Sequence, residues 1–182
     1  SKFKGKAIAQ AIGTDYFTLL ELVPKRGVDL EIQDTVYIGK GKRDQIYKVL
    51  GKLDYENLTA TSRIELEYSI REIVNNNEEK FVDFFNTAGA ISTRLHKLEL
   101  IPGIGKKYMW EIVEARKEKP FESFEDITTR IPSLNNPAEM IVNRVKQELD
   151  TTTAKKGKKK YYLFTPIPKT QKKHRNNRNQ RK

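Results

Sequence analysis

Residues 100–107 restrict the fold of this chain more than any other stretch, because they read Leu-Ile-Pro-Gly-Ile-Gly-Lys-Lys and lead directly into a helical pattern. Gly103 and Gly105 carry no side chain, so the backbone can turn sharply and come within contact distance of another molecule. The first amides of the following helix lack intrahelical partners and point outward with the positive end of the dipole. The run therefore predicts either a plain structural turn or a turn that binds a phosphate oxygen.

The same turn recurs thirty residues later, because Ile131-Pro-Ser-Leu-Asn135 repeats the pattern of Ile101-Pro-Gly-Ile-Gly105. The repeat favours a motif over an isolated turn. In the second copy Ser133 and Asn135 replace both glycines; asparagine tolerates a left-handed backbone, and serine does so less readily. We therefore expect the second turn to hold the fold and to bind weakly, if at all.

Helices are expected on both sides of each turn. Around the second turn, Ser123 with Asp126 resembles a capping box, and Pro137 suits the first position of a helix. The predicted helices span 92–100, 106–119, 123–130 and 137–149. The candidate phosphate contacts of the first turn are Gly103, Ile104, Gly105, Lys106 and Lys107.

The first 58 residues contain short β-forming runs separated by Gly, Asp and Pro. Short strands at regular spacing predict a small closed or nearly closed β-barrel. A basic loop before the last strand is a second candidate for phosphate contact, although a solvated turn explains it equally well. Its cations are Lys40, Lys42 and Arg43, and the predicted strands span 3–12, 16–23, 30–38 and 45–53.

From Thr59 the apolar spacing becomes helical, with one helix that stops at three asparagines and another that runs from Asn77 to Gly89. The fold class is therefore α+β, with a barrel over 1–58, a helical region over 59–150, and a basic extension over 151–182 that has a candidate strand at 160–165. The exposed side of the first two helices is acidic and suits a basic protein partner; its acids are Glu65, Glu67, Glu72, Glu78, Glu79 and Asp83.

The net charge of +11 is concentrated at the C-terminal end of the chain. Residues 155–182 contain twelve Lys or Arg and no acid, whereas residues 1–154 contain 23 basic and 24 acidic residues, a net of −1. A block of like charge stays extended unless a polyanion neutralises it, so it indicates nucleic-acid binding or, alternatively, a solubilising tail. The candidate contacts are Lys158, Lys159, Lys160, Lys169, Lys172, Lys173, Arg175, Arg178, Arg181 and Lys182.

Several classes of function lack the residues that they require. The chain has no cysteine, so disulfides, thiolate chemistry and cysteine-based zinc sites are excluded. His96 and His174 have no metal-ligand spacing, and neither a P-loop nor a dinucleotide fingerprint occurs. No run of eighteen apolar residues occurs. We therefore expect a non-enzymatic cytoplasmic protein without a cofactor, a metal or a membrane partner.

The first turn resembles the helix-hairpin-helix family, in which hairpin amides bind a nucleic-acid phosphate without reading sequence. Met109 departs from the family pattern, which prefers a small residue there. Over about residues 3–165 the chain also resembles an archaeal family, domain of unknown function 655. That resemblance implies a barrel of the oligonucleotide/oligosaccharide-binding type, two hairpins, and binding of RNA or nucleotides. The hairpin resemblance is carried by Leu98, Ile101, Pro102, Gly103, Ile104, Gly105 and Ile112.

Three functions agree with these features. The first is an RNA-binding protein, most simply a ribosomal or ribosome-associated protein, because basic residues mixed with aromatics and asparagines suit folded RNA. The second is a DNA-binding accessory of repair or replication, which the hairpins alone favour. The third is an adaptor whose acidic helices dock a protein, and neighbouring ribosomal proteins would be such partners of an RNA-binding protein.

Overall fold

The computed structural model describes residues 7–152 and 160–168. These residues form five α-helices and two small antiparallel sheets, so the α+β class expected from the sequence is confirmed. The N-terminal sheet has the order β1–β2–β3, with strands Ala9–Ile12, Leu19–Pro24 and Ile46–Lys52. Ala9 pairs with Leu22 and Leu22 pairs with Val49, and the ladder shifts register twice between β2 and β3.

The prediction of a closed or nearly closed barrel was wrong, because the described part of the chain contributes only three strands here. The expected strand over 30–38 does not form, and Ile32 is 62% exposed. A barrel of the implied type is built from five strands. The segment between β2 and β3 instead folds through local turns, with Val28 N–H donating to Lys25 O at 3.1 Å and Asp34 N–H to Glu31 O at 3.3 Å.

The first two helices follow the prediction. A short 3-10 turn η1 (Tyr55–Asn57) precedes α1 (Ala60–Asn76), and α2 (Glu78–Thr87) follows directly. Thr59 caps α1, because its side-chain oxygen accepts the amide hydrogen of Ser62 at 3.1 Å. Asn77 separates the two helices, and its side-chain Nδ2 donates back to Ile73 O at 2.8 Å instead of capping α2.

The segment before the first turn differs from the prediction. In place of a helix over 92–100, the chain forms a two-stranded hairpin, β4 (Ala90–Ser92) and β5 (Leu95–His96), and then a 3-10 turn η2 (Lys97–Leu100). Reciprocal hydrogen bonds begin η2 at His96: its Nδ1 accepts from Leu98 N–H at 3.1 Å, and its own amide donates to Glu99 Oε2 at 2.8 Å. This capping box stops the extended segment and leaves room for a single helical turn.

The remaining helices were predicted correctly: α3 (Lys106–Glu118), α4 (Phe124–Arg130) and α5 (Pro137–Leu149). Ser123 Oγ caps α4 by accepting from Asp126 N–H at 3.0 Å. Pro137 lies at the start of α5, where its missing N–H costs no hydrogen bond. One turn thus joins η2 to α3, and the other joins α4 to α5.

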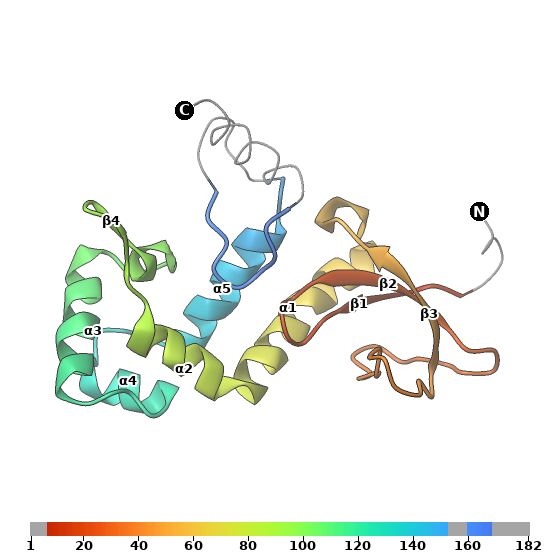
Figure 1. The fold of residues 1–182 in the computed structure, drawn as a ribbon, viewed down its shortest axis with the longest axis horizontal. Helices are drawn as coiled ribbons and strands as arrows, with labels where there is room; N and C mark the ends of the chain where they lie inside the picture. The colour runs from red at the N-terminus through yellow and green to blue at the C-terminus, as the bar shows by residue number, and fades with distance from the viewer. Residues whose placement is uncertain (1–6, 153–159, 169–182) are drawn as a thin grey trace.

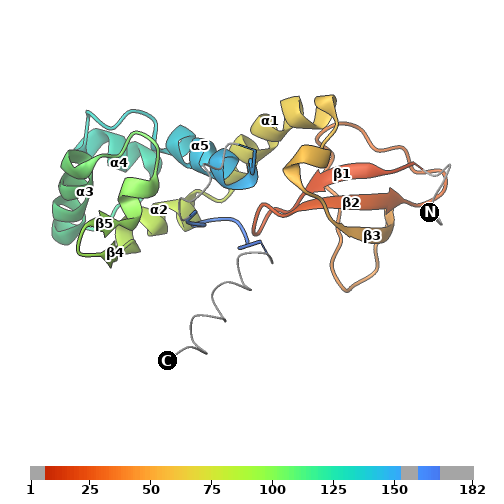
Figure 2. The same ribbon diagram turned by 90° about the horizontal axis from the view of Figure 1, so that it is seen from above.

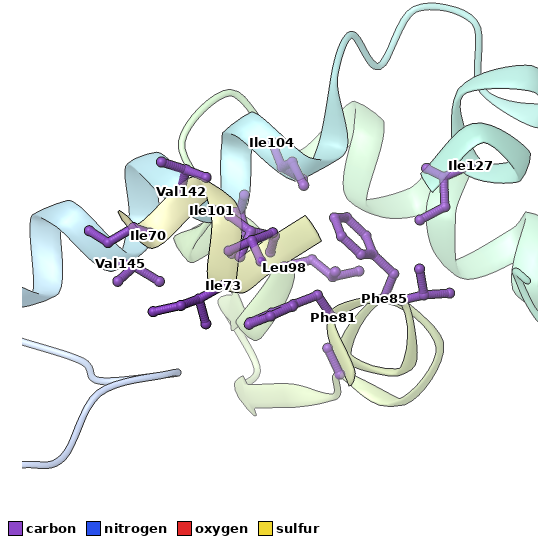
Figure 3. Close-up of a cluster of buried hydrophobic side chains, with 14 of the residues drawn as sticks. Ile70, Ile73, Phe81, Phe85, Leu98, Ile101, Ile104, Ile127, Val142 and Val145 are labelled. Atoms are coloured by element: carbon purple, nitrogen blue, oxygen red, sulfur yellow. The ribbon is translucent and has the colours of Figure 1, made fainter. Parts of the chain in front are cut away.

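The molecule is elongated, with the β1–β2–β3 sheet at one end and α3 and α4 at the other (Figures 1 and 2). α1 and α5 pack together between them. Buried side chains from α1, α2, α3, α4 and α5 form one core, which also includes both turns (Figure 3). On its surface Arg71 pairs with Glu67 at 2.8 Å and with Glu139 at 2.9 Å, linking α1 to α5.

Residues 160–168 lie along the helices without forming the strand expected at 160–165. Glu148 is only 2% exposed. Its carboxylate binds the backbone of this segment by accepting hydrogen bonds from the amides of Leu163, Phe164 and Thr165 at 2.7–3.0 Å. Amides that are bound to a carboxylate cannot pair with a sheet. The ring of Phe164 packs edge-on against Phe84, with 5.0 Å between the centroids.

Candidate nucleic-acid interface

The first hairpin, residues 101–105, is a tight turn anchored by two isoleucines. Ile104 N–H donates to Ile101 O at 3.0 Å, and Gly103 has a φ of 91°, a left-handed value that favours glycine. Ile101 and Ile104 are 1% and 3% exposed and lie in the core beside Leu98 (Figure 3). Both glycines are exposed at the surface. The apolar residues therefore fix the turn and leave its glycine backbone accessible.

Gly105 leaves the N-terminus of α3 open. It is the N-cap, and having no side chain it cannot accept a hydrogen bond from the first amides of the helix. A methyl group placed on Gly105 would meet nothing within 4 Å. The next two residues, Lys106 and Lys107, are both exposed. An anion that approaches Gly105 would thus meet helix amides and two ammonium groups.

Lys107 has only weak internal partners. Its side chain is 78% exposed, and its Nζ lies 3.9 Å from Glu111 Oε1 and 5.7 Å from the centre of the Tyr108 ring. Exposed ion pairs of this kind contribute little energy. The ammonium group is therefore free to exchange Glu111 for an external anion.

The second hairpin has the same turn but a closed helix end. Leu134 N–H donates to Ile131 O at 2.9 Å, as in the first turn. The chain then takes one additional residue before the helix: Asn136 is the N-cap of α5, with a φ of 48°, and its Oδ1 accepts from Glu139 N–H at 3.1 Å. Pro137 supplies no N–H. Fewer amides are thus available here than at Gly105, which supports the expectation of weaker binding by the second copy.

The two hairpins are held together by α5. A methyl group on Gly103 would lie 3.2 Å from Cε of Met140, so α5 packs closely against the first turn. Arg144 donates through Nη1 to Leu100 O at 3.1 Å and also pairs with Glu148 at 2.8 Å. Sequence analysis missed Arg144 and Glu148. The signal was the four-residue spacing of opposite charges on the inner face of an amphipathic helix.

Ile104 has a different role from the other candidates in this hairpin. Its side chain is buried and its amide is already bonded to Ile101 O within the turn. It therefore holds the turn in shape, and the accessible groups of the hairpin belong to Gly103, Gly105, Lys106 and Lys107.

The basic loop is not brought near the hairpin. It lies between β2 and β3, at the opposite end of the long axis from α3 (Figures 1 and 2). Lys40 and Lys42 are exposed, and Arg43 Nε donates to Gly39 O at 2.9 Å within the loop. The carbonyl of Arg43 accepts a hydrogen bond from Lys25 Nζ. The loop is thus an internally bonded turn that carries exposed cations.

Only one of the tail candidates falls within the described residues. Lys160 Nζ donates to Asp150 O at 3.0 Å, and burial lowers the pKa of this ammonium. It is therefore partly engaged inside the protein. The other tail candidates lie outside the described residues: Lys158, Lys159, Lys169, Lys172, Lys173, Arg175, Arg178, Arg181 and Lys182.

The acidic residues of the first two helices are partly used inside the molecule. Glu67 pairs with Arg71 and Lys146; the hydrogen bond from Lys146, and then that from Arg71, lowers the pKa of this carboxyl. Glu78 Oε1 accepts from Phe124 N–H at 2.6 Å, and Glu65 Oε2 accepts from Gln33 at 2.8 Å. Glu72, Glu79 and Asp83 remain exposed.

A family model described as "Protein of unknown function (DUF655)" matches residues 1–166. The chain belongs to this family. The DUF655 match includes both hairpins and Glu148 with most of the segment that it binds. It ends before Lys169, so the last seven cations lie beyond it.

Two relatives of this DUF655 protein come from archaea. The chain is 48% identical over 157 residues to the uncharacterized protein MJ0038 of Methanocaldococcus jannaschii, covering 86% of this chain and 70% of the relative. It also resembles the crystal structure of Af1531 from Archaeoglobus fulgidus, a DUF655 protein, with 46% identity and a TM-score of 0.79. That match covers 88% of this chain and 86% of the crystallised one.

Neither a metal cluster nor a membrane-spanning helix is found in the described part of this DUF655 chain. Within residues 7–152 and 160–168, no three His, Asp or Glu residues cluster as a metal site would require. In the same ranges, no helix has the length and apolar character that crossing a bilayer requires. At the hairpin itself, the N-cap Gly105 offers no side-chain acceptor to the first amides of α3, and Lys106 and Lys107 are exposed.

Proposed function

We propose that this protein binds RNA without catalysis, by contacting the sugar–phosphate backbone through its first hairpin. In this proposal residues 97–118 act as a helix-hairpin-helix element whose first helix is reduced to one 3-10 turn. The observation that carries the proposal is the open end of α3, where Gly105 exposes helix amides beside Lys106 and Lys107. Such a site recognises a phosphate and is indifferent to the base attached to it.

The basic extension favours RNA over DNA. It combines cations with Tyr161, Tyr162 and several asparagines, a mixture suited to the loops and unstacked bases of folded RNA, whereas Phe164 packs inside the protein on Phe84. A neutral globular body with a basic arm suits a cytoplasmic ribosomal or ribosome-associated protein. Neighbouring proteins would then contact the acidic side of α1 and α2. DNA repair or replication is the second candidate, because a hairpin that contacts only phosphates accepts either polymer.

The N-terminal sheet contributes less to this proposal. Its three described strands form an open sheet, and the basic loop beside β3 would give a second, separate phosphate contact. Since the loop between β2 and β3 lies far from α3 along the molecule, one bound strand would have to span its length to reach both sites (Figure 1).

The direct test is Gly105→Val. The backbone at Gly105 has a φ of −88° and open space around the missing side chain, so valine fits the fold and covers the amides. We expect RNA affinity to fall roughly ten- to hundredfold, the value of one or two hydrogen bonds to a charged group. Fluorescence anisotropy with a labelled ribosomal RNA fragment at constant salt measures the effect.

The matched control is Asn135→Val, which makes the same change at the corresponding position of the second hairpin. It should leave affinity unchanged, because Asn136 and Pro137 already close that helix end. Gly103 is unsuitable for this test, since its positive φ and the contact with Met140 would disturb the fold. A folded Gly105→Val variant that binds RNA like the natural protein would refute the proposed contact.

A second measurement separates RNA from DNA. Cell extracts are sedimented at moderate salt, with and without ribonuclease. We expect the protein to sediment with ribosomes and to be released by ribonuclease. Sedimentation that depends only on DNA would instead favour the repair or replication function.

A further inference from the structure

Trp110 is exposed on α3, one helical turn after the two lysines. It is the single tryptophan of the chain, and 58% of its surface is accessible. An exposed indole offers a large, flat apolar face that a ligand can cover. Nothing in the proposed phosphate contact uses this side chain.

The other exposed aromatic residues have partners inside the protein, so exposure alone does not mark a site. Tyr47, for example, has an interaction with another group of the protein. Within residues 7–152 and 160–168, Trp110 alone among the exposed aromatics has no ring, cation or hydrogen-bond partner. The remaining contacts are Lys80 over Tyr16 at 5.5 Å, Arg71 over Tyr68 at 5.8 Å, and Gly41 N–H to Tyr37 OH at 3.2 Å.

The helix geometry places Trp110 beside the phosphate contact. Residues three and four positions apart are neighbours on a helix surface, so Trp110 adjoins both Lys107 and Lys106. Side chains on an α-helix lean toward its N-terminus, and the indole therefore covers the first turn of α3 rather than the turn that follows. Met109 and Ile112 occupy the buried side of the same two turns.

A protein partner does not fit this surface as well as a nucleotide. Protein interfaces centre on contiguous apolar patches, whereas the other large exposed apolar residues lie away from α3. On its N-terminal side Trp110 adjoins the exposed Lys106 and Lys107, whereas Val113 and Glu114 follow it one turn later, and Glu114 is paired with Lys117. A flat ring with two ammonium groups on the side of the hairpin matches a base attached to a phosphate.

We propose that Trp110 stacks on an unpaired base of the strand whose phosphate lies at Gly105. This rests on the proposed function and narrows it to single-stranded segments, loops or bulges. The bases of a duplex are stacked on one another and offer no free face to the indole. The hairpin would then bind the phosphates of any RNA, and Trp110 would favour RNA segments whose bases are unpaired.

The single tryptophan allows a direct readout, because stacking on a base alters indole fluorescence. The full chain is titrated with a twelve-nucleotide oligouridylate, with a DNA oligomer of matching sequence, and with a blunt RNA duplex. Anisotropy of a labelled strand reports binding in parallel. We expect tryptophan quenching that follows occupancy for single strands, and binding without quenching for the duplex.

Variants measure how much the Trp110 ring contributes to the binding free energy. Trp110→Ala should weaken binding to the single strand by roughly five- to 150-fold, the usual range for losing one stacked base, and should leave duplex affinity unchanged. Trp110→Phe should retain most of the affinity. Tyr68→Ala, which removes an aromatic ring of similar exposure from α1, is the control and should have no effect.

The outcomes distinguish the two proposals. Binding to single-stranded RNA without quenching, together with unchanged affinity in Trp110→Ala, would overturn the role of Trp110 and leave the hairpin proposal standing. Equal quenching by the DNA oligomer would support stacking without a preference for RNA, and quenching by the DNA oligomer alone would support stacking on DNA. Failure of every nucleic acid to bind would overturn both.

Discussion

Asn136 is the residue that makes the second turn differ from the first. Both turns close with the same hydrogen bond, from Ile104 to Ile101 and from Leu134 to Ile131. The N-cap comes four residues after Ile101 in the first turn and five after Ile131 in the second. The additional residue brings a side-chain acceptor to the helix amides. A single additional residue thus turns an open helix N-terminus into a capped one.

At the same scale, His96 should make stability depend on pH. Burial, and then the nearby charge of Arg116, lowers the pKa of this imidazole. Its neutral form accepts the hydrogen bond from Leu98 at Nδ1. Because the pKa of His96 is lowered in the folded state, its contribution to the unfolding free energy is complete above about pH 6.5. It is lost as the pH falls from there through the folded-state pKa, because the unfolded chain takes up the proton first.

His96→Asn tests this dependence, since asparagine keeps a capping acceptor and does not titrate. Between pH 7.5 and 5.5 we expect the natural protein to lose roughly 1 kcal/mol more unfolding free energy than the variant, the usual value of a helix cap. Urea unfolding at both pH values measures the difference. Parallel pH profiles for the two proteins would contradict the assigned role of His96.

Among the elements, α5 connects most parts of the fold. It packs against α1, its Met140 contacts the first turn, and its Arg144 bonds to Leu100. Arg144 also bonds to Tyr161 O, and Glu148 binds the amides of 163–165. The helix that belongs to the second hairpin therefore positions the first hairpin and the start of the basic extension together.

Glu148→Gln should release the C-terminal segment from α5. The substitution removes the charge that four donors of residues 163–165 share and leaves Arg144 without its ionic partner. We expect a loss of roughly 2–4 kcal/mol in unfolding free energy. Amide hydrogen exchange at 163–165 should also become faster. Urea unfolding and exchange measured by mass spectrometry report the two effects.

Thr165→Val is the matched control for this anchor, because it removes one hydroxyl donor at 3.0 Å and keeps the backbone donors. It should cost about 1 kcal/mol. Equal stability of Glu148→Gln and the natural protein would mean that the carboxylate does not hold the segment.

At the scale of the whole molecule, positive charge is found at several places that lie far apart. Residues 1–154 are nearly neutral, and the excess positive charge lies in residues 155–182. The hairpin and the basic loop lie at opposite ends of the long axis (Figure 1). The candidate phosphate contacts of the hairpin and of the basic loop are therefore separate and do not form one continuous basic surface.

Removing residues 169–182 should weaken binding in a salt-dependent way. These residues carry seven cations and lie beyond Phe164, which packs on α2, so their loss should leave the described fold intact. If the full chain neutralises about six phosphates, log affinity should fall against log salt with a slope of roughly −4 to −5. The shortened chain should give a clearly smaller slope. Equal slopes for both chains would show that the tail is only solubilising.

Local features of the sequence predicted most of the helices. The Ser123 cap acts through a hydrogen bond to Asp126, three residues away, and Pro137 and the glycines of the first turn act through their own backbone geometry. The apolar spacing likewise marked the faces of α1, α3 and α5 that are buried. The candidate hairpin was visible for the same reason, since its shape depends on residues 101–105 themselves.

Features that depend on distant partners could not be found in this way. The alternating residues of 30–38 resemble a strand but find no neighbour, and residues 160–165 give their amides to Glu148 instead of a sheet. A strand exists only if another segment pairs with it, and that choice is made by the packing of the entire chain.

The sequence by itself therefore determined the turns, the caps and the distribution of charge in this protein. Only the tertiary structure decided that the sheet stays open, that Arg144 ties the two hairpins together, and that Trp110 stands free beside the lysines. The physical reason is range: capping and helical periodicity act between neighbours in the chain, whereas burial, exposure and strand pairing are settled between residues that meet only after folding.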